Sequence, residues 1–214
     1  MANITWDAAG DRLYETGVSN CALYIQTSTG YSAPVAWNGI TAISESPSGA
    51  ESSSVYADNM KYLNLTSAEE LSVTVEAYMY PEEFEQCDGT AELAAGVLLG
   101  QQSRKSFGLC YKTKIGNDVD GDAHGYKLHL IYGLKASPSE KAYSTINDSP
   151  EAITFSWECK ATPVTVTGHE ATSIVTVDST RITSAKLTAL ESALLDDTTG
   201  TLLTPDAIST LMAS

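Results

Sequence analysis

The chain has few basic residues: 12 Lys and Arg stand against 27 Asp and Glu among its 214 residues, and the formal net charge is −15. Nucleic-acid phosphates are bound by clustered Lys and Arg, but the densest basic segment is only Arg104 and Lys105, followed by Lys112 and Lys114. The composition therefore argues against specific binding of nucleic acid. An acidic surface that faces DNA has a use only where DNA has to slide past without adhering.

Long hydrophobic runs and cysteine pairs are also missing. No apolar run approaches the ~18 residues that a membrane helix needs, and the N-terminus lacks the basic region and apolar stretch of a signal peptide. We therefore expect that the chain does not contact a membrane. We also expect that it is synthesised in a reducing cytoplasm. An even number of cysteines allows two disulfides in three pairings, but this compartment favours free, buried thiols. The cysteines are Cys21, Cys87, Cys110 and Cys159.

Motifs for catalysis or metal binding are absent from the sequence as well. It contains no G-x-S-x-G, phosphate-loop or dinucleotide-binding pattern, and His124, His129 and His169 lack the spacing of zinc or triad residues. Aligning Gly121 with the sixth position of a calcium loop places Lys127 at the twelfth, where a Glu is required. We expect no enzymatic activity, no metal and no cofactor.

Alternating apolar and polar residues predict a mainly β fold. The clearest alternation places five side chains on the inner face of one strand: Ile153, Phe155, Trp157, Cys159 and Ala161. Further strands are predicted at 22–26, 35–43, 71–80, 106–114, 125–133 and 173–177. The strands 106–114 and 125–133 form an antiparallel hairpin with an acidic tip.

A polar segment at residues 44–68 interrupts these strands. Its Ser-rich first half is typical of a loop, and loops of this length are usually functional or disordered. Tyr56, Met60, Tyr62 and Leu65 are nevertheless too apolar for a solvated linker. We therefore predict a long inter-strand loop that a partner orders.

Helical signals are confined to two places. Pro81, followed by two glutamates, predicts one short α-helix after the strand 71–80. Leucines at helical spacing predict a helix near 184–195 with Thr183 or Ser184 as its N-cap, and Pro205 begins a second. The expected fold is a mainly β sandwich or barrel with one short flanking α-helix and a helical C-terminal tail, divided into a domain 1–180 and an extension 181–214.

Three stretches have an order and spacing that match one known family. They are Glu76-Ala-Tyr-Met-Tyr-Pro-Glu-Glu-Phe-Glu-Gln-Cys-Asp-Gly89; Gln101 to Tyr111, continuing through Gly116-Asn-Asp118 to Gly125-Tyr-Lys-Leu-His-Leu-Ile-Tyr-Gly133; and Thr154-Phe-Ser-Trp157 with Ala161-Thr-Pro-Val164, Ala171-Thr-Ser173 and Val177-Asp-Ser-Thr180. In this combination the chain resembles the major tail proteins (tail tube proteins) of long-tailed, non-contractile bacteriophages of Gram-positive hosts.

The resemblance implies a structural virion protein. Members of that family form hexameric rings that stack into a hollow tail tube, through which DNA passes to the host without specific binding. Their β-sandwich-like barrels extend one another's sheets into a continuous inner cylinder. The implied partners are further copies of the chain, a tape measure protein in the lumen, and tail terminator and distal tail proteins at the ends. The implied location is the phage tail, assembled in the host cytoplasm.

The resemblance also implies three sets of assembly residues. The first belongs to the loop that reaches the adjacent ring: Ser46, Tyr56, Asp58, Asn59, Met60, Tyr62 and Leu65. The second belongs to an N-terminal arm at residues 4–14: Trp6, Leu13 and Tyr14. The third consists of acidic residues that could face the lumen or the outer wall: Glu76, Asp118 and Glu158.

Other functions fit parts of the sequence. A tube protein of a related bacterial injection system would share these features. A β-sandwich module that binds carbohydrate, or an adhesin, would use the 11 tyrosines for stacking and the acidic tip for calcium. The missing signal peptide and the unusual segment 44–68 count against this second alternative.

Overall fold

The computed structural model describes residues 4, 6–146, 148 and 151–213. The fold is mainly β, as the alternating sequence pattern predicts. Its strands are β1 (Tyr14–Thr27), β2 (Gly30–Tyr31), β3 (Val35–Trp37), β4 (Ile40–Gly49), β5 (Ser52–Ala57), β6 (Met60–Thr66), β7 (Glu69–Ala77), β8 (Ala91–Ala94), β9 (Val97–Leu99), β10 (Phe107–Asn117), β11 (Gly121–Ala136), β12 (Phe155–Lys160), β13 (Val164–Val166), β14 (His169–Thr172) and β15 (Ile174–Asp178). Its helices are the short 3-10 turns η1 (Glu82–Phe84) and η2 (Ser179–Arg181) and the α-helices α1 (Ser184–Leu195) and α2 (Pro205–Ala213).

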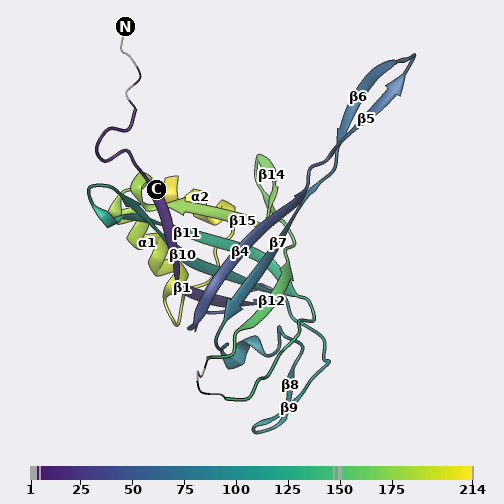
Figure 1. Cartoon of the computed structure of the whole chain (residues 1–214), viewed down its shortest axis with the longest axis vertical. Coiled ribbons are helices and arrows are strands. Elements are labelled where there is room, and N and C mark those ends of the chain that lie inside the picture. Colours follow the sequence, from purple (N-terminus) through teal and green to yellow (C-terminus); the bar gives the residue numbers. More distant parts are fainter. Residues whose placement is uncertain (1–3, 5, 147, 149–150, 214) are drawn as a thin grey trace.

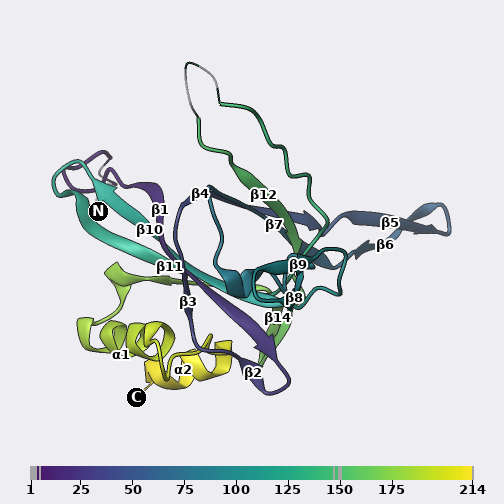
Figure 2. The ribbon, with the colours of Figure 1, turned by 90° about the horizontal axis from the view of Figure 1, so that it is seen from below.

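Two layers of antiparallel strands form the body of the molecule (Figure 1 and Figure 2). The central sheet contains β3, β1, β10, β11 and β15 in that order. The outer sheet contains β12, β7 and β4. Strand β11 contributes to both, because its last two residues pair with Lys160 and Cys159 of β12.

A bulge allows β11 to bend from one sheet into the other. Opposite β10, the pairing shifts by one residue between Leu109↔Ile131 and Phe107↔Leu134. Gly133 lies at this shift with φ +60°, and a Cβ atom there would be 2.5 Å from the carbonyl oxygen of Thr162. A glycine in the left-handed region is the residue that such a bulge requires, and the bulge increases the local bend.

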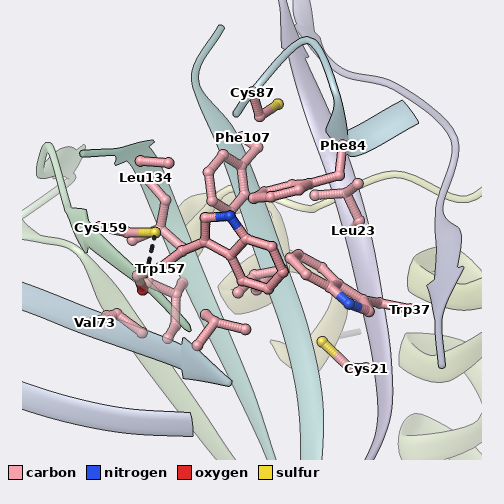
Figure 3. Close-up of a cluster of buried hydrophobic side chains, with 14 of the residues drawn as sticks. Cys21, Leu23, Trp37, Val73, Phe84, Cys87, Phe107, Leu134, Trp157 and Cys159 are labelled. Atoms are coloured by element: carbon pink, nitrogen blue, oxygen red, sulfur yellow. Dashed lines mark hydrogen bonds between the residues drawn. The ribbon is translucent and has the colours of Figure 1, made fainter. Parts of the chain in front are cut away.

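The inner core lies between the two sheets, around the fully buried indole of Trp157 (Figure 3). The ring centroid of Trp157 is 5.2 Å from that of Phe84 and 5.6 Å from that of Trp37. Leu23 of β1 and Val73 of β7 close the cluster from the two sheets. The predicted inward positions of Trp157 and Cys159 are therefore confirmed.

A second core covers the opposite face of the central sheet, where α1 and α2 pack on the strands (Figure 2). Leu190 and Leu194 of α1 and Ile208 of α2 are buried there against Tyr24. The Tyr24 hydroxyl donates a hydrogen bond of 2.9 Å to the Leu194 carbonyl oxygen. The central sheet is consequently buried on both faces, which explains the unbroken run of buried residues at 21–25.

Most predicted elements are found. Every predicted strand overlaps one in the structure, and 106–114 with 125–133 forms the hairpin β10–β11. The two C-terminal helices begin as expected: Thr183 is the N-cap residue of α1, and α2 starts at Pro205. Neither helix in the described part of the chain is long and apolar enough to cross a membrane.

Two local predictions are wrong. Residues 44–68 are not a loop, because β4, β5 and β6 occupy nearly all of them. The helix expected after Pro81 is a single 3-10 turn, η1. It ends quickly because Phe84 and Cys87 both enter the inner core, after which Gly89, at φ +80°, redirects the chain.

Candidate assembly surfaces

A two-stranded arm projects beyond the body at one end of the molecule (Figure 1). Strands β4 and β7 pair from Ile40↔Ala77 out to Gly49↔Glu69, and β5 and β6 continue the projection as a hairpin. We call residues 52–66 the arm. Gly49 has φ +87°, and a Cβ atom there would be 2.3 Å from the Ala68 carbonyl oxygen. Only glycine therefore fits where β4 leads into the arm.

The tip of the arm is a two-residue turn between the paired residues Ala57 and Met60. Asp58 has φ +51° and Asn59 has φ +62°. Positive φ at both central residues is the type I′ geometry that matches the twist of a hairpin, and Asp and Asn tolerate it well. These two predicted assembly residues thus shape the tip of the arm.

The arm exposes apolar side chains that no other part of the described chain covers. Its large exposed residues are Val55, Tyr56, Met60, Tyr62, Leu63 and Leu65. Tyr56 is 70% exposed and Tyr62 is 67% exposed. An isolated two-stranded hairpin is marginally stable in water, and contiguous exposed apolar surface marks interaction sites. Ser46, assigned to the same set, lies in β4 opposite Ser72 and below the arm.

The N-terminal segment is tied to the tip of the β10–β11 hairpin. The Tyr14 hydroxyl donates to Oδ1 of Asp122 at 2.9 Å, and the Gly10 amide donates to Oδ1 of Asp118 at 3.0 Å. Trp6 is 80% exposed, and Leu13 is exposed as well. Residue 5 of the predicted N-terminal arm lies outside the described residues. Tyr14 therefore makes an internal contact, while Trp6 and Leu13 face outwards.

The predicted acidic residues fall in two places. Glu76 and Glu158 lie on the outward face of the outer sheet, where Glu76 is opposite Ser156 and Glu158 is opposite Thr74. Asp118 lies at the β10–β11 tip, bonded to the N-terminal segment. The fold therefore brings Glu76 and Glu158 together and leaves Asp118 apart from them.

A titratable cluster joins the two sheets where β4 faces the first half of β1, in an open surface pocket of about 480 Å³. The His129 imidazole stacks on the Tyr111 ring at 4.8 Å between centroids. Its Nδ1 lies 3.5 Å from Glu45 Oε1, and its Nε2 lies 3.5 Å from Glu15 Oε1. Glu45 also accepts a hydrogen bond from the Tyr111 hydroxyl. These contacts connect β1, β4, β10 and β11 across large sequence separations.

Both carboxyl groups of this cluster have lowered pKa values. The interaction with His129 lowers the pKa of Glu45, and it outweighs the opposing effect of burial. For Glu15, burial acts to raise the pKa, but hydrogen bonds from Lys127 and Thr113 together lower it below its usual range. The cluster therefore stabilises both groups as carboxylates. The sequence contains no local pattern that could have revealed it.

The four cysteines are buried and free, as predicted. Burial raises the pKa of Cys87, Cys110 and Cys159 to about 12, and it raises that of Cys21 as well. Thiols in such surroundings are poor nucleophiles. Across the described ranges, His, Cys, Asp and Glu form no group of three or more that could hold a metal ion.

A further exposed surface was not predicted. Residues 91–99 form the hairpin β8–β9, in which every residue is exposed. Its large apolar side chains are Leu93, Val97, Leu98 and Leu99. The run of Ala and Leu in this segment has no clear strand or helix periodicity, so the hairpin could not be predicted from it.

No protein-family model and no curated protein matches the chain. Among solved structures, it is similar to a chain of an extracellular contractile injection system, the PVC sheath–tube complex in its extended state. That match has 12% identity and a TM-score of 0.33, and it covers 74% of this chain and 88% of the other. A chain of the anti-feeding prophage (AFP) baseplate has 10% identity and a TM-score of 0.36, with 81% and 97% covered. At these values, neither likeness assigns a function to this chain.

Proposed function

We propose that this chain is a structural subunit that polymerises with copies of itself into a hollow tube of the phage-tail type. The arm is the observation that carries the proposal. It holds six large exposed apolar side chains on a hairpin that extends away from two well-packed cores. Such a hairpin gains its stability from a partner, and in a homopolymer each neighbouring copy supplies one.

The edge of the outer sheet supports lateral assembly. Among the described strands, β4 pairs only with β7, so the other edge of residues 40–49 has unpaired backbone groups. Pro47 lies in this strand, and proline is tolerated on edge strands. A neighbouring subunit that adds a strand here would extend the sheet from copy to copy. We propose that six copies close a ring in this way and that rings stack through their arms.

The outward face of the outer sheet suits the lumen of such a tube. It carries Glu76 and Glu158 among Ser and Thr residues, with Lys160 opposite Ser72 at one end, and the chain has a net charge of −15. In a tube built from chains of this net charge, we expect the lumen to repel DNA and allow it to slide. The proposed partners are a tape measure protein inside the tube and tail terminator and distal tail proteins at its ends. The proposed location is the phage tail, after assembly in the host cytoplasm.

Negative-stain electron microscopy of the purified protein, across salt and protein concentration, tests the proposal. We expect rings or hollow tubes with a regular axial repeat. Assembly should improve as salt screens the repulsion between acidic subunits. Dispersed monomers under every condition, also after addition of tail-tip and tape measure proteins, would reject it and favour a binding module.

The arm variant Tyr56→Ser/Tyr62→Ser makes the test specific. We expect it to remain folded and to lose tube formation. Tyr143→Ser is a matched control, because Tyr143 is also exposed but lies outside the arm. Equal assembly of both variants would show that the arm is not the stacking element.

A further inference from the structure

Two exposed apolar hairpins lie at opposite ends of the molecule. The arm projects from one end, and the β8–β9 hairpin lies at the other (Figure 1). In Figure 2 the molecule is seen from below, with β8 and β9 near the middle of the view and the arm extending to the side. A contact between two different surfaces at opposite ends is heterologous, and it propagates from copy to copy.

The base of the β8–β9 hairpin is firmly anchored to the body. The Gln102 amide donates to the Gly89 carbonyl oxygen at 2.9 Å, and the Lys105 amide donates to the Gln86 carbonyl oxygen at 3.0 Å. Arg104 adds a side-chain hydrogen bond of 3.0 Å to the Asp88 carbonyl oxygen. The exposed apolar residues are thus presented on a fixed support, which lowers the entropic cost of binding.

A groove of about 650 Å³ runs between η1 and this hairpin. Leu98 contributes apolar surface to it, and Glu82, Glu85 and Glu92 contribute carboxylates beside the single cation Lys105. The groove is therefore acidic and mostly polar, with Leu98 as its one large apolar side chain, and it suits a ligand that combines apolar surface with a positive charge.

The arm meets this requirement in part, because it is apolar and carries one cation, Lys61, which is balanced by one anion, Asp58, at its tip. Its only charged residues are Asp58 and Lys61, so its formal charge is zero in a chain of net charge −15. Lys61 lies opposite Tyr56 in the hairpin, directly before Tyr62. Two copies of so acidic a chain repel each other over most of their surfaces. The arm has a formal charge of zero and an exposed cation, Lys61, so it is the part best able to approach the acidic groove.

We propose that the groove between η1 and the β8–β9 hairpin receives the arm of a second copy of this chain, with Lys61 near Glu92. This inference rests on the proposed function, because it identifies where the stacking arm docks in the next ring. It assigns to residues 91–99 the role of a docking surface for the arm.

Disulfide trapping tests the contact directly. The double variant Lys61→Cys/Glu92→Cys should form a ladder of covalent dimers, trimers and longer species on mild oxidation, visible by non-reducing electrophoresis. Each single variant should give dimers at most, since it has one exposed thiol per chain. The four native thiols are buried with raised pKa values and provide little background.

Charge reversal provides a second readout. Lys61→Glu and Glu92→Lys should each reduce the pelleted, assembled fraction by roughly tenfold, about 1.4 kcal/mol, and the double reversal should restore most of it. Tubes that form normally in the wild type, without a ladder and without sensitivity to either reversal, would overturn the docking site and leave the proposed function intact. Absence of both tubes and ladder in all conditions would overturn both.

Discussion

The central sheet and the arm both contain tyrosine and aliphatic side chains, but in opposite surroundings. Residues 21–25 of β1 are all buried, because the outer sheet covers one face and α1 and α2 cover the other. In the arm, residues 52–66, Ala57 is partly buried and every other residue is exposed. The comparison shows that apolar strand residues remain exposed where no second layer covers them. For the arm, the proposed function assigns that layer to a second copy of the chain.

The two regions also differ in how their hydrogen bonds connect the chain. In the helix-covered core, the Tyr24 and Tyr132 hydroxyls donate to the carbonyl oxygens of Leu194 and Leu203, each at 2.9 Å. In the arm, the side-chain bond from Ser54 to Asn64, at 2.9 Å, links only the two strands of the hairpin. Core substitutions should therefore change the stability of the monomer, and arm substitutions should change its assembly.

The largest effect on stability is expected at the centre of the inner core. Trp157→Ala leaves a large cavity among aromatic rings and should lower the free energy of unfolding by about 3–5 kcal/mol. Trp157→Phe should cost clearly less, because within the described residues the indole Nε1 has no hydrogen-bond partner to lose. Denaturant titration measures both. Equal losses for the two variants would contradict the packing described here.

A smaller effect is expected at the contact between sheet and helix. Tyr24→Phe removes the hydroxyl that donates to the Leu194 carbonyl oxygen and should lower the free energy of unfolding by about 1 kcal/mol. Tyr56→Phe in the arm is the matched control, since that side chain is exposed. If both variants are equally stable, the hydrogen bond does not hold α1 to the sheet.

The strands of the core could be predicted from sequence because their side chains alternate. Trp157 and Cys159 point inwards as the pattern indicates, and Phe107, Leu109 and Tyr111 share the inner core. The C-terminal helices could be predicted from leucine spacing and from Pro205. In each case the environment of a residue repeats with the period of its own element, so the signal is local.

The candidate surfaces could be predicted only in part. The apolar residues of the arm indicated a partner. Its strands could not be predicted, because they are Ser-rich and have the composition of a loop. Their pairing depends on backbone hydrogen bonds and on the turn at Asp58-Asn59. The cluster around His129 joins residues from four strands, so no local pattern marks it. The division of the chain into a domain 1–180 and an extension 181–214 stays a prediction.

A pH-dependent effect, smaller than the loss of the Tyr24 hydrogen bond, is expected at the cluster that joins the two sheets. The folded-state pKa of Glu45 is lowered, so its contribution to stability is present above its ordinary pKa and is lost as pH falls through the lowered value. Glu45→Gln should flatten the decline in thermal stability below about pH 4.5. Thermal melts of both proteins between neutral pH and about pH 3 measure this. Identical pH profiles would show that Glu45 does not couple β4 to His129.

The smallest effect on the monomer is expected in the arm itself. Tyr62→Ser removes a side chain that is already exposed, so it should change the free energy of unfolding by no more than about 0.5 kcal/mol under conditions that keep the chain monomeric. Denaturant titration of dilute protein at low salt measures this value. A loss of several kcal/mol would mean that the arm packs on its own body in solution. That result would contradict the proposed difference between a core that is stable within one chain and an arm that needs a second copy.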